Sequence, residues 1–260
     1  LPGLHELVPT AGGPVGVHGH LPGTLRITRG GQNVVHRFVG GIHGGYEWNS
    51  VALAYAAIDA LDNGMLAVPT SLTVTVIPSL NPDGVHAVTG QGGRVRAADV
   101  PPDADLAVGR FNARGVDLNR NFDCKWAPES TWKGEQVSAG TAPFSEPEAR
   151  ALKRFVDQHI PQAVVFWHSK ANAVFASECT GGILPKTIDM MNVYAEASGY
   201  RPIETFDAYP ITGDAEGWLA SRGIPAITVE LETRDSIEWS RNRRAIRSLF
   251  SLFAPSEPGT

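Results

Sequence analysis

Residues 110–122 read R-F-N-A-R-G-V-D-L-N-R-N-F. This stretch gathers three arginines, three asparagines and one aspartate around the apolar residues Val116, Leu118 and Phe122, which is unusual for a buried strand or helix. Arginine presents a planar fork that matches a carboxylate bidentately, and asparagine carries directional donors. The stretch therefore suits a site that holds a free carboxylate. The alternative is a polar loop that satisfies its own hydrogen bonds, and the flanking sequence has to distinguish the two.

On both sides of this stretch, segments with the apolar pattern of a β-strand alternate with segments that have the apolar spacing of an α-helix. We expect strands over residues 25–28, 34–42, 72–77, 163–167 and 226–231. We expect helices over residues 48–61, 145–159, 188–198, 213–221 and 239–253. A capping box at Ser145 would open the second helix. A turn over 81–84, loops over 89–105 and 123–143, and an irregular segment over 1–24 complete the prediction.

The alternation of strands and helices predicts an α/β fold. We expect residues 1–260 to form a single-domain sandwich with a central mixed, largely parallel sheet flanked by helices. Ligands of such sheets bind outside the carboxyl ends of the strands. The sequence contains neither G-x-G-x-x-G nor a phosphate-loop motif, which argues against nucleotide binding.

Composition narrows the class of protein further. A chain of 260 residues buries roughly 70–75% of its unfolded surface on folding. Its apolar fraction of 42% and charged fraction of 19% are those of ordinary globular proteins. A net charge of −5 argues against nucleic acid or an anionic membrane as partner, and no apolar run approaches the ~20 residues of a membrane span. We expect a monomer.

The two cysteines and the start of the chain bear on its compartment. Cys124 and Cys179 form either one disulfide, which would indicate an oxidising compartment, or two buried thiols. Neither belongs to a C-x-x-C pair, which argues against a thiolate metal site. The chain begins at Leu1 without a signal-peptide pattern, so we expect a mature or trimmed form of a secreted or periplasmic protein.

Polar residues follow three of the predicted strands. His43 and Glu47 come after residues 34–42, His168 comes after 163–167, and Glu230 lies near the end of 226–231. Two histidines and a carboxylate are a sufficient ligand set for a catalytic zinc ion, and Glu230 would be a spare carboxylate beside it. The alternative for each histidine is an ordinary hydrogen-bonded residue at a strand end. The remaining histidines lack a predicted acidic partner and stay unassigned: His5, His18, His20, His36, His86 and His159.

Together these residues resemble the funnelin-type zinc carboxypeptidases and their bacterial peptidoglycan-peptidase relatives. The matching motifs occur in the order of that family: I-H-G-G-Y-E-W-N from Ile42, N-P-D-G from Asn81, G-V-D-L-N-R-N-F from Gly115, P-F-S-E-P-E from Pro143, W-H-S from Trp167, Y-P-I-T-G-D from Tyr209 and T-V-E-L from Thr228. The resemblance implies a zinc-dependent metallocarboxypeptidase that acts on peptides with a free C-terminal carboxylate.

The resemblance also implies residue roles at the metal. One Zn²⁺ ion would be held by His43, Glu47 and His168. Glu230 would be the general base and then the general acid, and Asp117 would orient His43 from the second shell of the site. The family usually spaces its first two ligands as H-x-x-E, whereas His43 and Glu47 are separated by one residue more.

Further roles concern the substrate. Asn119 and Arg120 would bind its terminal carboxylate, Arg110 would stabilise the scissile carbonyl oxygen, and Tyr209 would close over the bound peptide. The choice of Arg110 follows the short R-x-N-A-x-G-V-D-L-N-R form of the bacterial relatives, with Arg114 as the alternative. Only 42 residues precede His43, so we expect a compact version of the fold.

Specificity is left open between several substrates. Glu216 matches the position that is acidic in carboxypeptidases preferring C-terminal Arg or Lys, and Asp214 would add to this preference. A solvated Glu216 is the alternative. The same neighbours also suit a murein stem peptide with γ-D-Glu-meso-diaminopimelate. A less favoured alternative is an N-acyl amino acid deacylase of the same fold. An alternative from a different functional class is a non-catalytic binding module.

Overall fold

The computed structural model describes residues 6–8, 16–18, 25–28 and 34–254. Their strands are β1 (Glu6–Val8), β2 (Gly16–His18), β3 (Leu25–Thr28), β4 (Val34–Val39), β5 (Leu72–Ile77), β6 (Glu129–Trp132), β7 (Glu135–Ser138), β8 (Ala163–Ser169), β9 (Ala173–Ala176), β10 (Glu178–Cys179), β11 (Gly182–Ile183), β12 (Arg201–Ile203) and β13 (Ala226–Leu231). The α-helices are α1 (Trp48–Asp62), α2 (Pro82–Thr89), α3 (Pro147–His159), α4 (Pro185–Ser198), α5 (Ala215–Ser221) and α6 (Trp239–Phe253). Short 3₁₀ helices are η1 (Gly44–Glu47), η2 (Ala97–Asp99), η3 (Leu106–Arg110) and η4 (Leu118–Arg120).

The main sheet of the described residues has the strand order β12-β9-β13-β8-β4-β5-β3-β1-β2. Its centre consists of the parallel strands β13, β8, β4 and β5. Antiparallel pairs flank this centre, with β9 against β13 on one side and β3 against β5 on the other. The predicted mixed, largely parallel sheet flanked by helices is confirmed.

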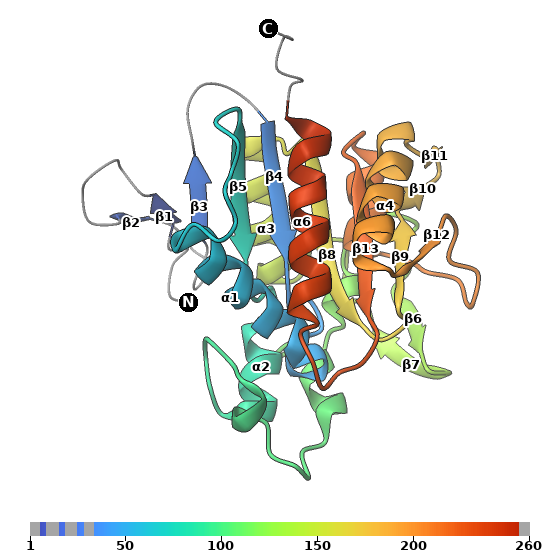
Figure 1. The fold of residues 1–260 in the computed structure, drawn as a ribbon. Coiled ribbons are helices and arrows are strands. Elements are labelled where there is room, and N and C mark those ends of the chain that lie inside the picture. The colour runs from blue at the N-terminus through green and yellow to red at the C-terminus, as the bar shows by residue number, and fades with distance from the viewer. Residues whose placement is uncertain (1–5, 9–15, 19–24, 29–33, 255–260) are drawn as a thin grey trace, which may run out of the picture.

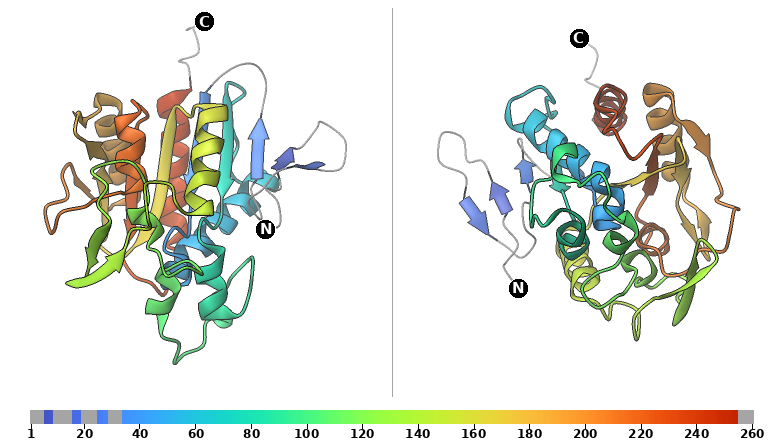
Figure 2. Two further views of the ribbon diagram at one scale, coloured as in Figure 1. Left: turned by 180° about the vertical axis from the view of Figure 1, so that it is seen from behind. Right: turned by 90° about the horizontal axis from the view of Figure 1, so that it is seen from below.

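Alternate residues of the central strands face two hydrophobic layers, because successive side chains of a strand point to opposite faces. Phe38 and Val165 pack with α1, α4 and α6 on one face, and Val39 and Phe166 pack with α3 and α5 on the other. Figure 1 shows α4 and α6 in front of the sheet, and the view from behind in Figure 2 shows α3 covering the opposite face. No helix in the described parts of the chain is long and apolar enough to cross a membrane.

The predicted irregular segment over residues 1–24 needs a correction. Glu6–Val8 and Gly16–His18 pair as antiparallel strands and extend the edge of the main sheet beyond β3. These strands are only three residues long, too short for a period to be visible in the sequence. The rest of the 1–24 prediction, with His5 and His20, lies outside the described residues.

Two local predictions about helix starts are wrong. Asn81-Pro82-Asp83-Gly84 is not a turn between strands but the start of α2, because the Asn81 side chain accepts a hydrogen bond from Gly84 N and Pro82 takes the first helical position. The capping box at Ser145 does not form. The Ser145 Oγ instead accepts from Asn121 Nδ2 and donates to Glu146 Oε1, and the helix begins at Pro147.

The expected loop over residues 123–143 contains a hairpin. Strands β6 and β7 pair antiparallel across a turn at Lys133 and Gly134, which both have positive φ. The sequence analysis also missed the short strands β9 to β12. It placed the end of β4 three residues too late, since Gly40 and Gly41 leave the sheet, and the start of α4 three residues too late, at 188 instead of 185.

A buried histidine makes the stability of this fold sensitive to pH. His36 on β4 is 1% exposed, its Nε2 has no hydrogen bond, and burial together with Lys186 lowers its pKa from 6.5 to about 4. Between pH 4 and 6.5, His36 is therefore protonated in the unfolded chain but neutral in the folded chain. We expect this residue to cost about 2 kcal/mol of unfolding free energy on going from pH 8 to pH 5, with full stability above pH 6.5 and loss as pH falls towards 4.

Urea denaturation of the wild type and of His36→Leu at these two pH values checks this expectation. The variant should lose about 2 kcal/mol less than the wild type over that interval, while His86→Gln, a change of an exposed histidine on α2, should follow the wild type. Parallel pH dependences for wild type and His36→Leu would contradict the prediction.

Candidate active site

A cavity of about 980 Å³ lies at the carboxyl ends of the central parallel strands. It is lined by residues that follow or end β4, β8 and β13, among them His43, His168 and Glu230. Parallel strands bring their carboxyl ends to the same edge of a sheet, so residues far apart in the sequence meet there. The fold therefore brings together the polar residues that the sequence analysis placed at strand ends.

The segment after β4 positions His43 and Glu47. Gly41 and Gly44 adopt φ of +63° and +45°, and a Cβ at Gly44 would lie 2.7 Å from the carbonyl oxygen of Gly109. Only glycine tolerates both the conformation and the close approach. The chain then winds into η1, which ends at Glu47. This 3₁₀ turn accommodates the extra residue between His43 and Glu47 and points both side chains into the cavity.

The geometry of His43, Glu47 and His168 fits a metal ion. One potential ligand atom of each lies within 4.8 Å of the others, and all three residues are buried. Glu47 Oε2 lies 3.2 Å from His168 Nδ1 but makes no hydrogen bond. Burial and then Arg110 hold the pKa of His43 well below 6.5, which favours the neutral imidazole that metals bind. Two histidines and a carboxylate are a donor set typical of catalytic zinc.

Asp117 links the metal candidates to the stretch 110–122. Its Oδ1 lies 3.5 Å from His43 Nδ1 and accepts a hydrogen bond from Asn119 N. Its Oδ2 accepts a hydrogen bond from Arg110 Nε at 2.9 Å and lies 2.8 Å from Arg110 Nη2 in the same ion pair. Asp117 is 0% exposed, so one buried carboxylate binds Arg110 and lies against His43.

Two further residues of this stretch line the cavity. Asn119 Oδ1 accepts a hydrogen bond from Ala215 N at the start of α5, which leaves the Asn119 amide NH₂ towards the cavity. Arg120 donates from Nη1 to the carbonyl oxygen of Asn119, and its buried Nε has no hydrogen bond. Arg110 also lines the cavity, whereas the alternative, Arg114, does not; the Arg114 side chain is 62% exposed and lies 3.8 Å from Glu146.

Glu230 faces the same cavity from β13, in register with His168 on β8. Its Oε2 is buried and makes no hydrogen bond. Burial and then the charge of Glu47 raise the pKa of Glu230 to about 7. A carboxylate with a pKa near neutrality can both accept and return a proton.

Glu216 lies on α5 at the opposite side of the His168 ring from Glu47. Its Oε1 lies 2.9 Å from His168 Nε2 and accepts a hydrogen bond from Thr228 Oγ1. Glu216 is 3% exposed and lines the cavity, so the alternative of a solvated residue is wrong. Burial alone would raise the pKa of Glu216, but the hydrogen bond and charge of His168 outweigh it and lower this pKa.

Glu216 affects the pKa of two neighbours, His168 and Asp214. Burial opposes the protonated form of His168, yet Glu47 and Glu216 together raise its pKa well above the usual value. Asp214 caps α5, with its Oδ2 accepting from Gly217 N, and burial followed by Glu216 raises its pKa to about 6. One carboxylate oxygen of Asp214 is thus occupied by the hydrogen bond that caps α5.

Tyr209 lies in the segment between β12 and α5. Its side chain is 42% exposed, lines the rim of the cavity and contacts Phe206 edge to face. Other residues of the cavity were not predicted from the sequence, among them Tyr46, Trp132, Lys133, Lys170 and Arg234. The only signal in the sequence was their proximity to the motifs, since the residues belong to the hairpin and to segments next to strand ends.

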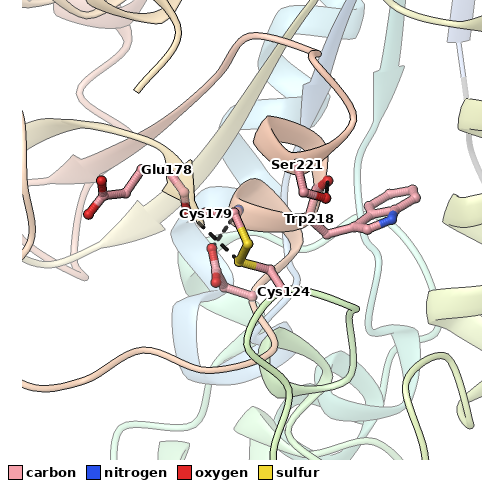
Figure 3. Close-up of a disulfide and its surroundings, with 7 residues drawn as sticks. Cys124, Glu178, Cys179, Trp218 and Ser221 are labelled. Carbon is pink, nitrogen blue, oxygen red and sulfur yellow. Dashed lines mark hydrogen bonds between the residues drawn. A yellow bond between two sulfur atoms is a disulfide. The ribbon is translucent and has the colours of Figure 1, made fainter. Parts of the chain in front are cut away.

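A disulfide between Cys124 and Cys179 borders the cavity, which confirms the first of the two predicted alternatives. Figure 3 shows it beside the helix that carries Trp218 and Ser221. A Cβ at Gly217 would lie 2.9 Å from Cys124 Sγ, so α5 packs directly on the bridge. Closing a loop of 55 residues stabilises the fold by about 4 kcal/mol in the chain-entropy description. The bridge thereby braces the helix that carries Glu216.

Comparisons with known proteins identify the family of this chain. Residues 22–248 match the family model of the zinc carboxypeptidases. Murein peptide amidase A of Escherichia coli is 30% identical over 156 residues, 54% of this chain and 59% of that protein. γ-D-Glutamyl-L-diamino acid endopeptidase 1 of Lysinibacillus sphaericus is 26% identical over 169 residues, 61% of this chain and 42% of that protein. Human carboxypeptidase A6 is 29% identical over 143 residues, 49% of this chain and 32% of that protein.

Solved structures resemble the fold over most of the chain. The murein-tripeptide amidase of Escherichia coli O157 superimposes with a TM-score of 0.62 at 20% identity and covers 98% of this chain and 92% of its own. Thrombin-activatable fibrinolysis inhibitor gives a TM-score of 0.65 at 19% identity over 88% of this chain and 65% of its own. The chain spans between a third and three fifths of the length of the three curated relatives named above. On the match over residues 22–248, this chain belongs to the zinc carboxypeptidase family.

Proposed function

We propose that the protein is a zinc-dependent metallocarboxypeptidase that releases the C-terminal residue of peptides. The observation that carries this proposal is that one cavity contains the ligand set, the buried carboxylate of Glu230 and the pair Asn119 and Arg120. The ligand set and Glu230 would catalyse hydrolysis, and Asn119 with Arg120 would recognise the C-terminal carboxylate of a peptide.

The proposed chemistry begins with the residues around the metal. His43, Glu47 and His168 would hold one zinc ion, which when bound lowers the pKa of water and polarises a carbonyl group. The Glu230 carboxylate would take a proton from the attacking water and deliver it to the nitrogen of the departing residue. Its raised pKa, about 7, suits both transfers near neutral pH.

Arg110 would stabilise the negative charge that develops on the scissile carbonyl oxygen. Its guanidinium is fixed by Asp117, and a preorganised donor of this kind is worth roughly 3–4 kcal/mol in comparable sites. Asn119 and Arg120 would bind the terminal carboxylate, since both line the cavity and both carry hydrogen-bond donors. This geometry favours removal of one terminal residue over internal cleavage, and Tyr209 on the rim would cover the bound peptide.

For specificity, we propose a basic terminal side chain. Both hydrogen bonds of Glu216 converge on Oε1, so Oε2 makes none within the described residues and is left to receive a substrate ammonium. A murein stem peptide ending in meso-diaminopimelate is the second candidate. It is favoured by two relatives named for murein peptides and for γ-D-glutamyl-L-diamino acids, and its distal ammonium suits Glu216 equally.

A deacylase of N-acyl amino acids and a non-catalytic binding module are the remaining proposals. The intact set of His43, Glu47, His168 and Glu230 argues against the binding module, because a protein without catalysis would be free to lose any of them. The disulfide supports a secreted or periplasmic protein, since such bonds persist in oxidising compartments.

A mass-spectrometric digest of defined peptides tests the proposal. The panel contains peptides ending in Arg, Lys, Phe and Asp and a stem peptide containing γ-D-Glu-meso-diaminopimelate, each with and without a zinc chelator. We expect chelator-sensitive loss of one terminal Arg or Lys. Cleavage of the stem peptide alone would establish the second candidate, and no cleavage of any member would overturn the peptidase proposal.

A further inference from the structure

Three cationic side chains in the lining of the cavity lie around one aromatic ring. The Cζ of Arg234 lies 4.1 Å from the centroid of the Tyr46 ring, the Nζ of Lys133 5.5 Å and the Cζ of Arg110 5.8 Å. Trp132 packs edge to face on the same ring and contacts Lys133 and Arg110 as well. Positive charges so close together repel one another unless anions offset them.

Of these three side chains, Arg110 alone forms an ion pair with a carboxylate within the described residues, although the charge of Arg234 also favours the charged form of the nearby Glu230. Arg110 is paired with the buried Asp117. Within the described residues, neither Arg234 nor Lys133 forms an ion pair with a carboxylate. The cation–π contacts with Tyr46 and Trp132 attract these charges without neutralising them.

Arg234 is also held in place rather than free to move into solvent. Its Nη2 donates to the Tyr46 hydroxyl, at 2.7 Å, and to the carbonyl oxygen of Ser169, at 3.1 Å. Its Nε is buried and has no hydrogen bond. The segment that carries Arg234 is fixed by Asn49, which donates from Nδ2 to the carbonyl oxygens of Thr233 and Ser236. A positioned guanidinium that lines a cavity and forms no ion pair is a binding group for an anion.

The position of Arg234 along the cavity indicates which part of a substrate it would meet. Asn119 is bonded to the start of α5, and Glu216 on α5 contacts Nε2 of His168, so the terminal residue of a peptide would lie at the α5 end. Glu47 contacts the other nitrogen of the same ring, and Tyr46 with Arg234 lies next to Glu47. Arg234 therefore lies on the Glu47 side of His168, away from α5, and would face the substrate residue on the amino side of the bond to be cleaved.

We propose that Arg234, assisted by Lys133, binds a carboxylate carried by the substrate residue on the amino side of the cleaved bond. The proposal rests on the carboxypeptidase function above and refines its substrate class. Two sources would supply this carboxylate: the side chain of an α-linked Asp or Glu, and the free α-carboxylate of a γ-linked glutamyl residue. Both present one anion near the scissile carbonyl, and the experiment separates them.

The test uses two matched pairs of synthetic peptides that end in the same residue, Lys. The first pair is Ala-Glu-Lys and Ala-Gln-Lys with α-linkages. The second is Ala-γ-D-Glu-Lys and its α-amide, in which the carboxylate next to the γ-linkage is neutral. The zinc-loaded protein should prefer the carboxylate member of one pair by about 10- to 100-fold in kcat/KM, the value of one charged hydrogen bond.

Three variants locate the origin of this preference. Arg234→Gln should reduce it to less than about threefold, mainly through a rise in KM for the carboxylate member, whereas Arg234→Lys should keep part of it. Arg244→Gln, a change of an exposed arginine on α6 whose Nε donates to the Ala197 carbonyl oxygen, should keep all of it. A preference within the α-linked pair would identify a side-chain carboxylate as the ligand, and a preference within the γ-linked pair would identify the free α-carboxylate of the glutamyl residue.

Two outcomes would overturn the proposal. One is equal cleavage of both members of each pair by the wild type, in which case the carboxypeptidase function stands and the anion site does not. The other is an equal loss for charged and neutral peptides in Arg234→Gln, which would mean that Arg234 acts on Glu230 or the metal ligands instead. Absence of cleavage of all four peptides, together with the Arg- and Phe-ending peptides of the first panel, would remove the function and this inference together.

Discussion

Glu230→Gln is expected to lower kcat by roughly 10²–10⁴-fold, the usual contribution of a general acid–base group. The amide keeps the shape of the side chain but cannot accept the proton of the attacking water. Glu230 is not one of the three metal-ligand candidates, so the variant should bind one zinc ion per chain as the wild type does. Steady-state kinetics on the best peptide of the panel and metal analysis by mass spectrometry measure the two quantities.

The matched control is Glu232→Gln, two residues further along the same segment. Glu232 is exposed and pairs with Arg241 at 2.8 Å, away from the cavity lining. It should leave kcat within about twofold of the wild type, because exposed ion pairs contribute little. Wild-type turnover in Glu230→Gln would show that another group is the base, and loss of zinc would show that Glu230 acts on the metal.

Asp117→Asn is expected to affect three properties at once, because one carboxylate serves both His43 and Arg110. Loss of the charge should weaken zinc binding about 10- to 100-fold through His43. It should lower kcat by about 10²–10³-fold, since Arg110 would no longer be held where the oxyanion forms. It should also lower the unfolding free energy by about 3–5 kcal/mol, because Arg110 is left buried without a counter-charge.

Arg110→Gln separates these effects. It should show the same loss of kcat, yet retain wild-type zinc affinity, since Asp117 still faces His43. Zinc affinity is measured by competition with a chromophoric chelator, and stability by urea denaturation. If Asp117→Asn retained both full zinc affinity and full stability, the 3.5 Å approach of Asp117 to His43 and its ion pair with Arg110 would not be contributing as described.

The hydrophobic periods of the sequence were sufficient to predict the central sheet and most of the flanking helices. Long strands such as β5 and β13, and helices such as α1 and α6, carry a period over six residues or more. The carboxyl ends of parallel strands share one edge, so His43, His168 and Glu230 could be expected there together. The parts that were missed are short: β6 and β7 have four residues each, bury only one residue each and show no hydrophobic alternation strong enough to stand out.

Predictions from short motifs were also wrong where the same motif is typical of two different local structures. Asn81 followed by Pro82 is typical of a turn and of a helix start alike, because in both the asparagine side chain accepts from a nearby backbone N–H. The Ser145 hydroxyl accepts a hydrogen bond from Asn121, which lies 24 residues earlier, and therefore does not cap the helix as expected.

The sequence by itself determined the family, the class of fold and the set of residues at the strand ends, since each of these depends on residue type and spacing along the chain. The tertiary structure alone decided which partners those residues have. It joined Cys124 to Cys179, placed Arg110 rather than Arg114 in the cavity and set Glu216 against His168. It also gathered Lys133 and Arg234 around Tyr46. The physical reason is that such contacts depend on how separate helices, strands and loops pack on one another, and no local pattern in the chain encodes that distance.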